Sequence, residues 1–242
     1  TDGSIALRRR YIAAAKSMFN ESPIIGKGMG NYSRILESEY FLGNFALAEG
    51  KDGGTFYTPA TVVRYMVEVL DPQPGDKKFL DPACGSGNFL TETYLSLRRL
   101  ENKILLELSH GQVTMYSASE SPIQVSISQF YGIEINDFAV TVAKTALWIA
   151  ESQMMKETEK ILLVPLDFLP LKTNAYIVEG NALRTDWESV IPKSELNYIM
   201  GNPPFVGHQW RSKTQADDMK AVFYDLPKHG KLDYVTAWYQ KA

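Results

Sequence analysis

The segment Asn202-Pro203-Pro204-Phe205 combines groups that could hold an aromatic amine. Two consecutive prolines fix φ and carry no N–H, so the carbonyl of Pro203 can point outward as an acceptor. The amide oxygen of Asn202 supplies a second acceptor beside it, and Phe205 can stack on the plane of a base. A rigid loop without a ligand is the structural alternative. The segment therefore indicates a site that binds and orients the exocyclic amine of a nucleobase.

A glycine-rich segment, from Asp81 to Leu90, has the composition of a cofactor-binding loop. It follows a short apolar run and opens a predicted helix, which is the context that such a loop requires. Gly85 and Gly87 permit positive φ and a close approach of the backbone to a ligand, while Asp81 could hold a cationic ammonium group. The third glycine of the dinucleotide fingerprint is missing, which argues against NAD. A tight turn without a ligand is the alternative.

Two further polar positions follow predicted strands. Glu134 ends the strand predicted over 129–135 and offers two oxygens to a vicinal diol such as that of a ribose. It lies 47 residues after Gly87, farther than the usual spacing of about 20 residues, because a long helix and an excursion at 109–127 intervene. Asn181, after the next predicted strand, could meet the edge of an adenine ring. A solvated strand end and a polar turn are the respective alternatives.

The apolar pattern predicts elements that would bring these positions together. We expect strands at 79–80, 129–135, 175–179 and 196–200, and helices at 88–108 and 137–155. Such alternation favours a mostly parallel sheet with helices on both faces. Because the carboxyl ends of parallel strands lie at one edge of a sheet, this fold would gather Asp81, Glu134, Asn181 and Asn202.

Helical patterns flank this alternation. Residues 1–53 form a predicted N-terminal helical subdomain, with helices at 4–20 and 32–48 separated by glycines. A further helix begins with Thr58 as N-cap and Pro59 at its first position. Its apolar residues fall on one face, namely Val62, Val63, Met66, Val67 and Leu70. A last helix is expected over 232–239.

Composition limits the possible classes of protein. The chain has 242 residues and a net charge of −3, and it shows no apolar run long enough to span a membrane. Cys84 is the only cysteine, which excludes an internal disulfide and suits the reducing cytoplasm. One cysteine and three scattered histidines do not make a typical zinc site, so we expect no metal. The acidic balance argues against a complete nucleic-acid-binding apparatus.

Taken together, the segments 81–90, 132–136 and 202–205 resemble the ordered motifs of class I S-adenosylmethionine-dependent methyltransferases. They are most similar to the N6-adenine DNA methyltransferases, and within these to the methyltransferase part of fused restriction–modification or phage-defence enzymes. The segment Gly54 to Pro59 resembles the motif that precedes the glycine-rich loop in that family. The family often has Asp at the position of Asn181.

The resemblance implies an α/β, Rossmann-like sheet over residues 54–242 with S-adenosylmethionine bound at its edge. Asn202, Pro203, Pro204 and Phe205 would be catalytic, and a DNA base flipped out of the duplex would be the substrate. The segment 207–213, with an aromatic and two cationic residues, is a candidate for DNA contact. The cofactor-binding residues would be Tyr57, Thr58, Pro59, Asp81, Pro82, Ala83, Cys84, Gly85, Gly87, Glu134, Ile135, Asn181 and Ala182.

The family's sheet has more strands than the four predicted here, so the chain is expected to be truncated at its C-terminal end. A target-recognition domain or subunit would then lie outside it, and the strand at 196–200 would lie near an open sheet edge. Several other activities use similar motifs. N4-cytosine DNA methylation, RNA methylation, protein-glutamine methylation and a non-enzymatic cofactor-binding subunit stay open as alternatives.

Overall fold

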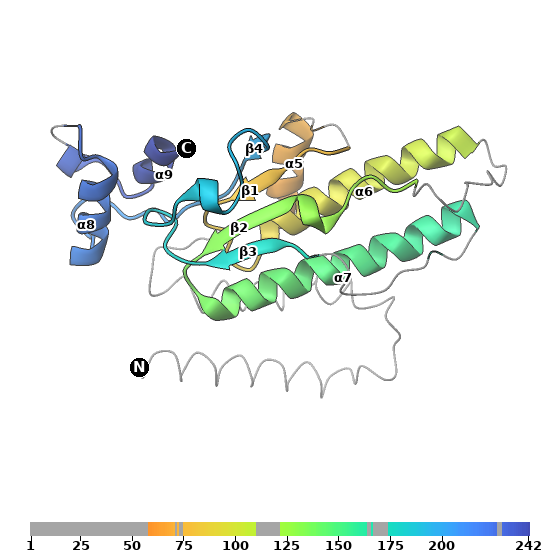
Figure 1. Cartoon of the computed structure of the whole chain (residues 1–242), viewed down its shortest axis with the longest axis horizontal. Helices are drawn as coiled ribbons and strands as arrows, with labels where there is room; N and C mark the ends of the chain where they lie inside the picture. Colours follow the sequence, from red (N-terminus) through yellow and green to blue (C-terminus); the bar gives the residue numbers. More distant parts are fainter. Residues whose placement is uncertain are drawn as a thin grey trace. The chain divides into compact units, whose positions relative to one another are not determined.

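The computed structural model describes residues 58–70, 72, 75–109, 122–163, 166, 174–226 and 229–242 (Figure 1). The subdomain expected at 1–53 lies outside these ranges, as do Tyr57 and the residues 110–121 of the predicted excursion. Pro204–Val206 fall in a different compact unit from the other described residues. Within the described ranges, no helix is both long enough and apolar enough to cross a membrane.

In the ranges that the structure describes, four parallel strands form the sheet, as the sequence predicts. They are β1 (Phe79–Asp81), β2 (Phe130–Glu134), β3 (Tyr176–Glu179) and β4 (Tyr198–Ile199). Their order is β3-β2-β1-β4, which corresponds to the first four strands of a doubly wound sheet. The order of connection reverses at β1, so β1 and β4 flank the topological switch point. In the described part of the chain, β4 is an edge strand, as expected for the strand at 196–200.

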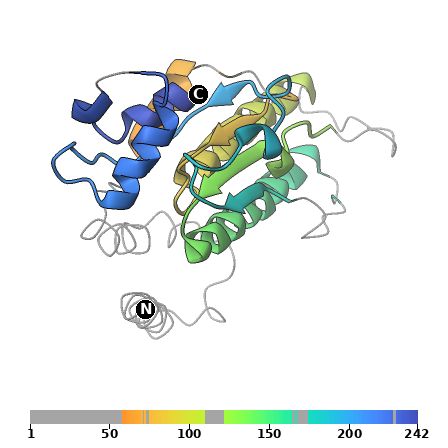
Figure 2. The ribbon, with the colours of Figure 1, turned by 60° about the vertical axis from the view of Figure 1, so that its left-hand side comes forward.

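The long helices lie on one face of the sheet. The helices α6 (Asn88–Ser109) and α7 (Asp137–Leu162) pack side by side, behind the strands in the view of Figure 2, and α5 (Ala60–Leu70) packs against α6. The opposite face carries the connection between β3 and β4, which contains a short 3-10 turn, η3 (Trp187–Ser189). In the described part of the chain, the connection between β3 and β4 on this face carries η3 rather than a long helix.

Aromatic stacking builds the centre of the core. The ring of Phe79 on β1 stacks between the rings of Phe130 on β2 and Tyr198 on β4, with centroid distances of 5.1 and 4.9 Å. Tyr94 of α6 meets Phe130 edge-on from the helical face. Strands buried in this way are apolar along their length rather than alternating, which is why the strand positions could be predicted from short apolar runs.

Of the apolar face predicted for α5, Val63 and Val67 are buried, while Val62, Met66 and Leu70 are exposed. The end of the excursion at 109–127 is not exposed, since Val125 and Ile127 lie in the core.

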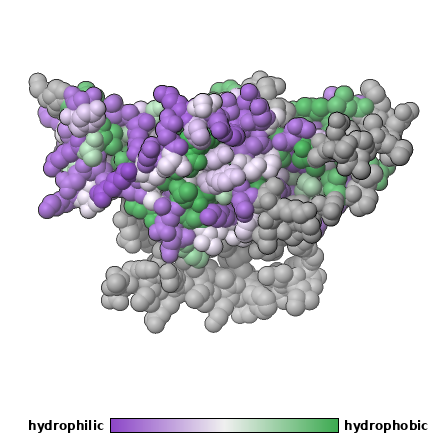
Figure 3. Space-filling model, in the orientation of Figure 1, coloured by the Kyte–Doolittle hydropathy of each residue, from purple (hydrophilic) through white to green (hydrophobic). Residues whose placement is uncertain are grey.

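Two short helices follow the sheet, α8 (Lys213–Val222) and α9 (Thr236–Lys241), with a 3-10 turn, η4 (His229–Lys231), between them. The helix predicted over 232–239 begins four residues later, at Thr236. The prediction did not include α8, although Ser212 and Gln215 form a capping box whose Ser-x-x-Gln spacing signals a helix start. The surface over α8 in Figure 3, at the left, is largely hydrophilic.

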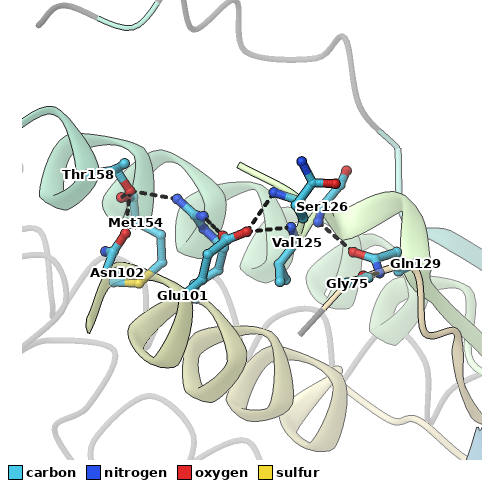
Figure 4. A network of polar contacts seen from close by, with 10 residues as sticks. Gly75, Glu101, Asn102, Val125, Ser126, Gln129, Met154 and Thr158 are labelled. Carbon is cyan, nitrogen blue, oxygen red and sulfur yellow. Dashed lines mark hydrogen bonds and ion pairs between the residues drawn. The ribbon is translucent and has the colours of Figure 1, made fainter. Parts of the chain in front are cut away.

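A buried polar network joins α6 and α7 near the amino ends of the strands (Figure 4). Arg98 is fully buried, forms an ion pair with Glu101, and donates through Nη2 to Thr158 Oγ1 at 2.7 Å. Glu101 Oε1 also accepts the backbone N–H groups of Gln124 and Val125, at 2.6 and 3.2 Å. The network therefore fixes the chain that leads into β2.

We predict that Glu101→Gln lowers the free energy of unfolding by about 3–5 kcal/mol, because it leaves the Arg98 guanidinium buried without its charged partner. Urea denaturation would measure the loss. Asp217→Asn is the matched control, since the Lys220–Asp217 pair has the same i,i+3 spacing but is exposed, and it should cost less than about 1 kcal/mol. Equal losses would contradict the structural role of the buried pair.

Candidate active site

The predicted site residues meet where open α/β sheets bind ligands, outside the carboxyl ends of the strands at the switch point. Asp81 ends β1, and Gly201 follows β4 beside it. A Cβ at Gly201 would overlap the Asp81 carboxylate, so this position requires glycine. The main chain that leads to Asn202 can therefore pass directly over the end of β1.

Asp81 is a buried carboxylic acid, with 1% of its surface exposed. Its Oδ1 accepts the N–H of Ala83 at 2.9 Å. Burial raises the pKa of Asp81 to about 7, and the negative charge of Glu134 raises it further, while the hydrogen bond from Ala83 opposes the shift. A carboxyl group in this environment would gain stability from a cationic ligand.

Glu134 ties the glycine-rich loop to the end of β2. Its Oε2 accepts the N–H of Gly85 and its Oε1 accepts the N–H of Asn136, both at 2.9 Å. Gly85 and Gly87 have φ of 52° and 82°, as expected for a loop that needs the left-handed region. Burial raises the pKa of Glu134, and the hydrogen bonds from Asn136 and Gly85 lower it.

Cys84 packs rather than reacts. Its side chain is buried, and a Cβ on Gly132 would lie 2.8 Å from Cys84 Sγ. Burial raises the pKa of the thiol well above its ordinary value, and the charges of Asp81 and Glu134 raise it further. Because the thiolate is the nucleophilic form, Cys84 is not suited to attack a substrate at neutral pH.

Thr58 connects the start of α5 to the predicted catalytic segment. Asn202 Nδ2 donates to Thr58 Oγ1 at 3.1 Å, and Asn88 Nδ2 donates to the Thr58 carbonyl at 2.6 Å. The helix begins at Ala60, one residue after the predicted first position, and the Pro59 carbonyl accepts the N–H of Val63. Sequence reasoning gave Asn88 no role, although it is the first residue of the helix after the glycine-rich loop.

The catalytic segment divides between the two compact units. Asn202 and Pro203 are half-buried and belong with the sheet, whereas Pro204 and Phe205 belong to the other unit, where Phe205 is exposed. The stacking role predicted for Phe205 stays a prediction.

Asn181 is held by contacts within the protein. Its Oδ1 accepts the N–H of Leu183 at 2.9 Å, and its Nδ2 donates to Oδ2 of Asp218, on α8, at 3.0 Å. Its neighbour Ala182 is buried, while Ile135 is exposed. Sequence reasoning missed Asp218, because nothing local in the segment of α8 links it to a position 37 residues away.

Two contacts attach α9 to the same edge. Trp238 Nε1 donates to the carbonyl of Pro82, in the predicted cofactor loop, at 3.0 Å. Lys241 Nζ donates to the carbonyls of Leu183 and Thr185, at 3.0 and 2.5 Å. The C-terminal helices thus cover the ends of β1 and β3, and neither contact was foreseen from the sequence.

The fold and this edge define a Rossmann-like α/β protein with buried acidic groups at its topological switch point. The chain belongs to the MmeI DNA-methyltransferase domain family, whose model matches residues 65–242. It is similar to DNA methyltransferase A of Bacillus subtilis (strain 168), with 44% identity over 178 residues that cover 72% of this chain and 20% of the relative. The Type I restriction enzyme HindI methylase subunit of Haemophilus influenzae is 28% identical over 84% of this chain and 35% of the subunit.

A solved structure of the Type IIL restriction–modification enzyme MmeI in complex with DNA has a similar fold. It matches with a TM-score of 0.64 and 32% identity, over 88% of this chain and 27% of that enzyme. The chain therefore spans about a fifth to a third of the length of these relatives.

We predict that Asp81→Asn stabilises the protein more at pH 8 than at pH 5. The folded pKa of about 7 lies above the ordinary value of 3.8, so the protonated form is favoured in the fold, and stability is lost as pH rises through that pKa. The neutral variant avoids this loss, and its advantage should grow by about 2–3 kcal/mol between the two pH values. Urea denaturation at each pH measures the difference.

Asp225→Asn, which removes an exposed carboxylate, is the control and should show no comparable growth. An Asp81→Asn advantage that is the same at both pH values would contradict the raised pKa.

Proposed function

We propose that the protein transfers a methyl group from S-adenosylmethionine to the N6 amine of adenine in DNA, within a restriction–modification or phage-defence system. One observation carries the proposal. Asn202 follows β4 at the switch point and contacts Thr58, beside the buried carboxylate of Asp81 and the loop held by Glu134. The names of the relatives, a DNA methyltransferase and a restriction-enzyme methylase subunit, support the same activity.

The residues at the edge fit the parts of S-adenosylmethionine. The buried carboxyl of Asp81, which is short of polar partners, suits the ammonium group. Glu134, held by the loop and by its own strand end, suits the ribose hydroxyls. Thr58, at the start of α5, suits the methionine carboxylate. When bound, the cofactor supplies an electrophilic methyl group.

Asn202 and Pro203 would orient the adenine amine for direct transfer. The lone pair of this amine is delocalised into the ring, so the nitrogen is a poor nucleophile. Hydrogen bonds from its N–H groups to Asn202 Oδ1 and the Pro203 carbonyl favour tetrahedral geometry and direct the lone pair toward the methyl group. In the orientation seen here, Asn202 Nδ2 donates to Thr58 Oγ1 at 3.1 Å, so Oδ1 is the end of the amide that would accept from the amine. Positioning and acceptors aimed at developing charge would carry the catalysis.

Access to the base requires that it leave the duplex. Trp210 is 82% exposed, and Lys213 is exposed at the start of α8, so both suit contact with DNA. Arg211 suits it less, because its Nη2 donates to the carbonyl of Gly230 at 2.6 Å. We assign target recognition to a domain or subunit beyond this chain, since few cations of the segment 207–213 are available for phosphates.

The activity is tested by incubating DNA with the complete protein and cofactor carrying a labelled methyl group. Mass analysis of the released nucleosides should show the label in N6-methyladenine. Label in N4-methylcytosine, or only in RNA or protein supplied in parallel, would contradict the proposed substrate.

We predict that Asn202→Ala lowers kcat about 100-fold or more, because an acceptor for the reacting amine is lost from the transition state. Cofactor affinity, measured by calorimetry, should stay within about threefold of the parent value, since the lost acceptor serves the substrate. Asn197→Ala is the matched control: this asparagine lies at the other end of β4 and accepts the N–H of Lys78. Near-normal turnover by Asn202→Ala would refute the mechanism.

We predict that Glu134→Gln weakens cofactor binding about tenfold, because a charged acceptor for the ribose hydroxyls is lost while side-chain size is kept. Glu179→Gln, at the paired position on β3, is the control and should bind normally. Calorimetry with S-adenosylmethionine measures both variants. If the two variants bind equally well, the assignment of Glu134 to the ribose is wrong.

A further inference from the structure

Asp218 is a buried carboxylate that collects hydrogen bonds from separate parts of the chain. It lies on α8 with 2% of its surface exposed. Its Oδ2 accepts from Asn181 Nδ2 at 3.0 Å and from the Tyr234 hydroxyl at 2.9 Å. Its Oδ1 accepts from Arg184 Nε at 2.6 Å. A carboxylate is stable in such a place only when its oxygens are paired in this way.

The contact with Asn181 determines the orientation of that amide. A carboxylate only accepts hydrogen bonds, so the Asn181 NH₂ group must face Asp218. The other end of the amide agrees, because Asn181 Oδ1 accepts the N–H of Leu183 at 2.9 Å in a local turn. Two independent partners therefore assign the same orientation, and a carbonyl oxygen has a second lone pair with which to accept from a ligand.

We propose that Asp218 is a positioning residue that holds Asn181 with its amide oxygen as the acceptor for the amine of the cofactor's adenine ring, and so selects adenine. This inference rests on the function proposed above, in which Asn181 lies at the cofactor's adenine. Asp218 acts through Asn181 and does not itself touch the cofactor.

The contacts of α9 support a role for the C-terminal helices in completing this site. Lys241 Nζ binds the carbonyls of Leu183 and Thr185, in the turn that begins at Asn181. The carbonyl of Asn181 in turn accepts the N–H groups of Arg184 and Thr185, both at 2.8 Å. The turn is thus fixed at its main chain, and Asp218 fixes its one amide side chain.

The contact between Asn181 and Asp218 also explains why residue 181 is asparagine, although aspartate is common at this position in the family that the sequence resembles. An aspartate at 181 would place a second carboxylate about 3 Å from Asp218, where like charges repel strongly in a buried site. Asparagine keeps an acceptor for the ligand and gives Asp218 a donor. The identities of residues 181 and 218 are therefore coupled.

The test compares binding of S-adenosylhomocysteine with binding of its hypoxanthine analogue, in which a carbonyl oxygen replaces the adenine amine. Calorimetry on the complete protein gives a Kd for each. The parent protein should prefer the adenine compound. Asp218→Asn removes one of the two partners that orient the Asn181 amide, because an amide at 218 can face Asn181 with either its oxygen or its NH₂ group. Only the N–H of Leu183 then opposes rotation of the Asn181 amide, so the ratio of the two Kd values should fall about threefold to tenfold. A loss of both affinities by the same factor would overturn the proposal.

Two further variants separate positioning from folding. Tyr234→Phe removes another donor to the same oxygen of Asp218 but leaves Asn181 in place, so the Kd ratio should stay at the parent value. In the double variant Asn181→Asp with Asp218→Asn, the new amide at 218 donates to a carboxylate at 181, so preference for adenine should return. A Tyr234→Phe ratio that falls like that of Asp218→Asn, or a double variant without recovery, would refute the positioning role.

The outcomes also distinguish this inference from the function on which it rests. If the parent protein binds neither compound, the proposed cofactor is wrong and the inference falls with it. If the parent binds and prefers the adenine compound but Asp218→Asn leaves the ratio unchanged, the proposed function stands and the role of Asp218 is refuted.

Discussion

In the register between β1 and β2, Asp81 lies opposite Gly132, and the geometry of the candidate site follows from this pairing. The register carries the glycine-rich loop over the end of β2, where the Cys84 N–H donates to the carbonyl of Ile133. A side chain at Gly132 would collide with Cys84 Sγ, so the loop can approach β2 this closely only because residue 132 is glycine. In this position, the N–H of Gly85 reaches the carboxylate of Glu134. A shift of one residue would turn each side chain of β1 to the opposite face.

The same edge shows what the sequence could predict and what it could not. Strand positions follow from short apolar runs, and the ends of parallel strands must meet, so Asp81 and Glu134 could be assigned to one edge from sequence alone. The partners of Asn181 could not be assigned, because Asp218 lies on a helix that no apolar pattern marked. The burial of α5 could not be predicted for a related reason. Periodicity gives the apolar face of a helix, but the neighbouring elements decide how much of that face is buried.

The polar groups at the two ends of the sheet differ in how far hydrogen bonds and ion pairs compensate their burial. At the amino ends, Arg98 pairs with Glu101 and donates to Thr158, and the side chain of Gln129 donates to the carbonyl of Lys77. These contacts hold α6, α7 and the chain that leads into β2 together. At the carboxyl ends, burial raises the pKa values of Asp81 and Glu134, because desolvation exceeds the compensation from their hydrogen bonds. Carboxyl groups whose pKa values are raised in this way are typical of functional sites.

The sign of the charge at this edge constrains what the site can bind. Asp81, Glu134 and Asp218 bring carboxyl groups to the ends of β1, β2 and the turn after β3. Among the cations there, Arg184 is paired with Asp218 and Lys241 with main-chain carbonyls. A cationic, hydroxyl-bearing ligand suits such an edge, whereas the phosphates of a nucleic acid do not. Under the proposed function, the phosphate contacts of DNA would therefore come from surfaces away from this edge, and only an extruded base would approach Asn202.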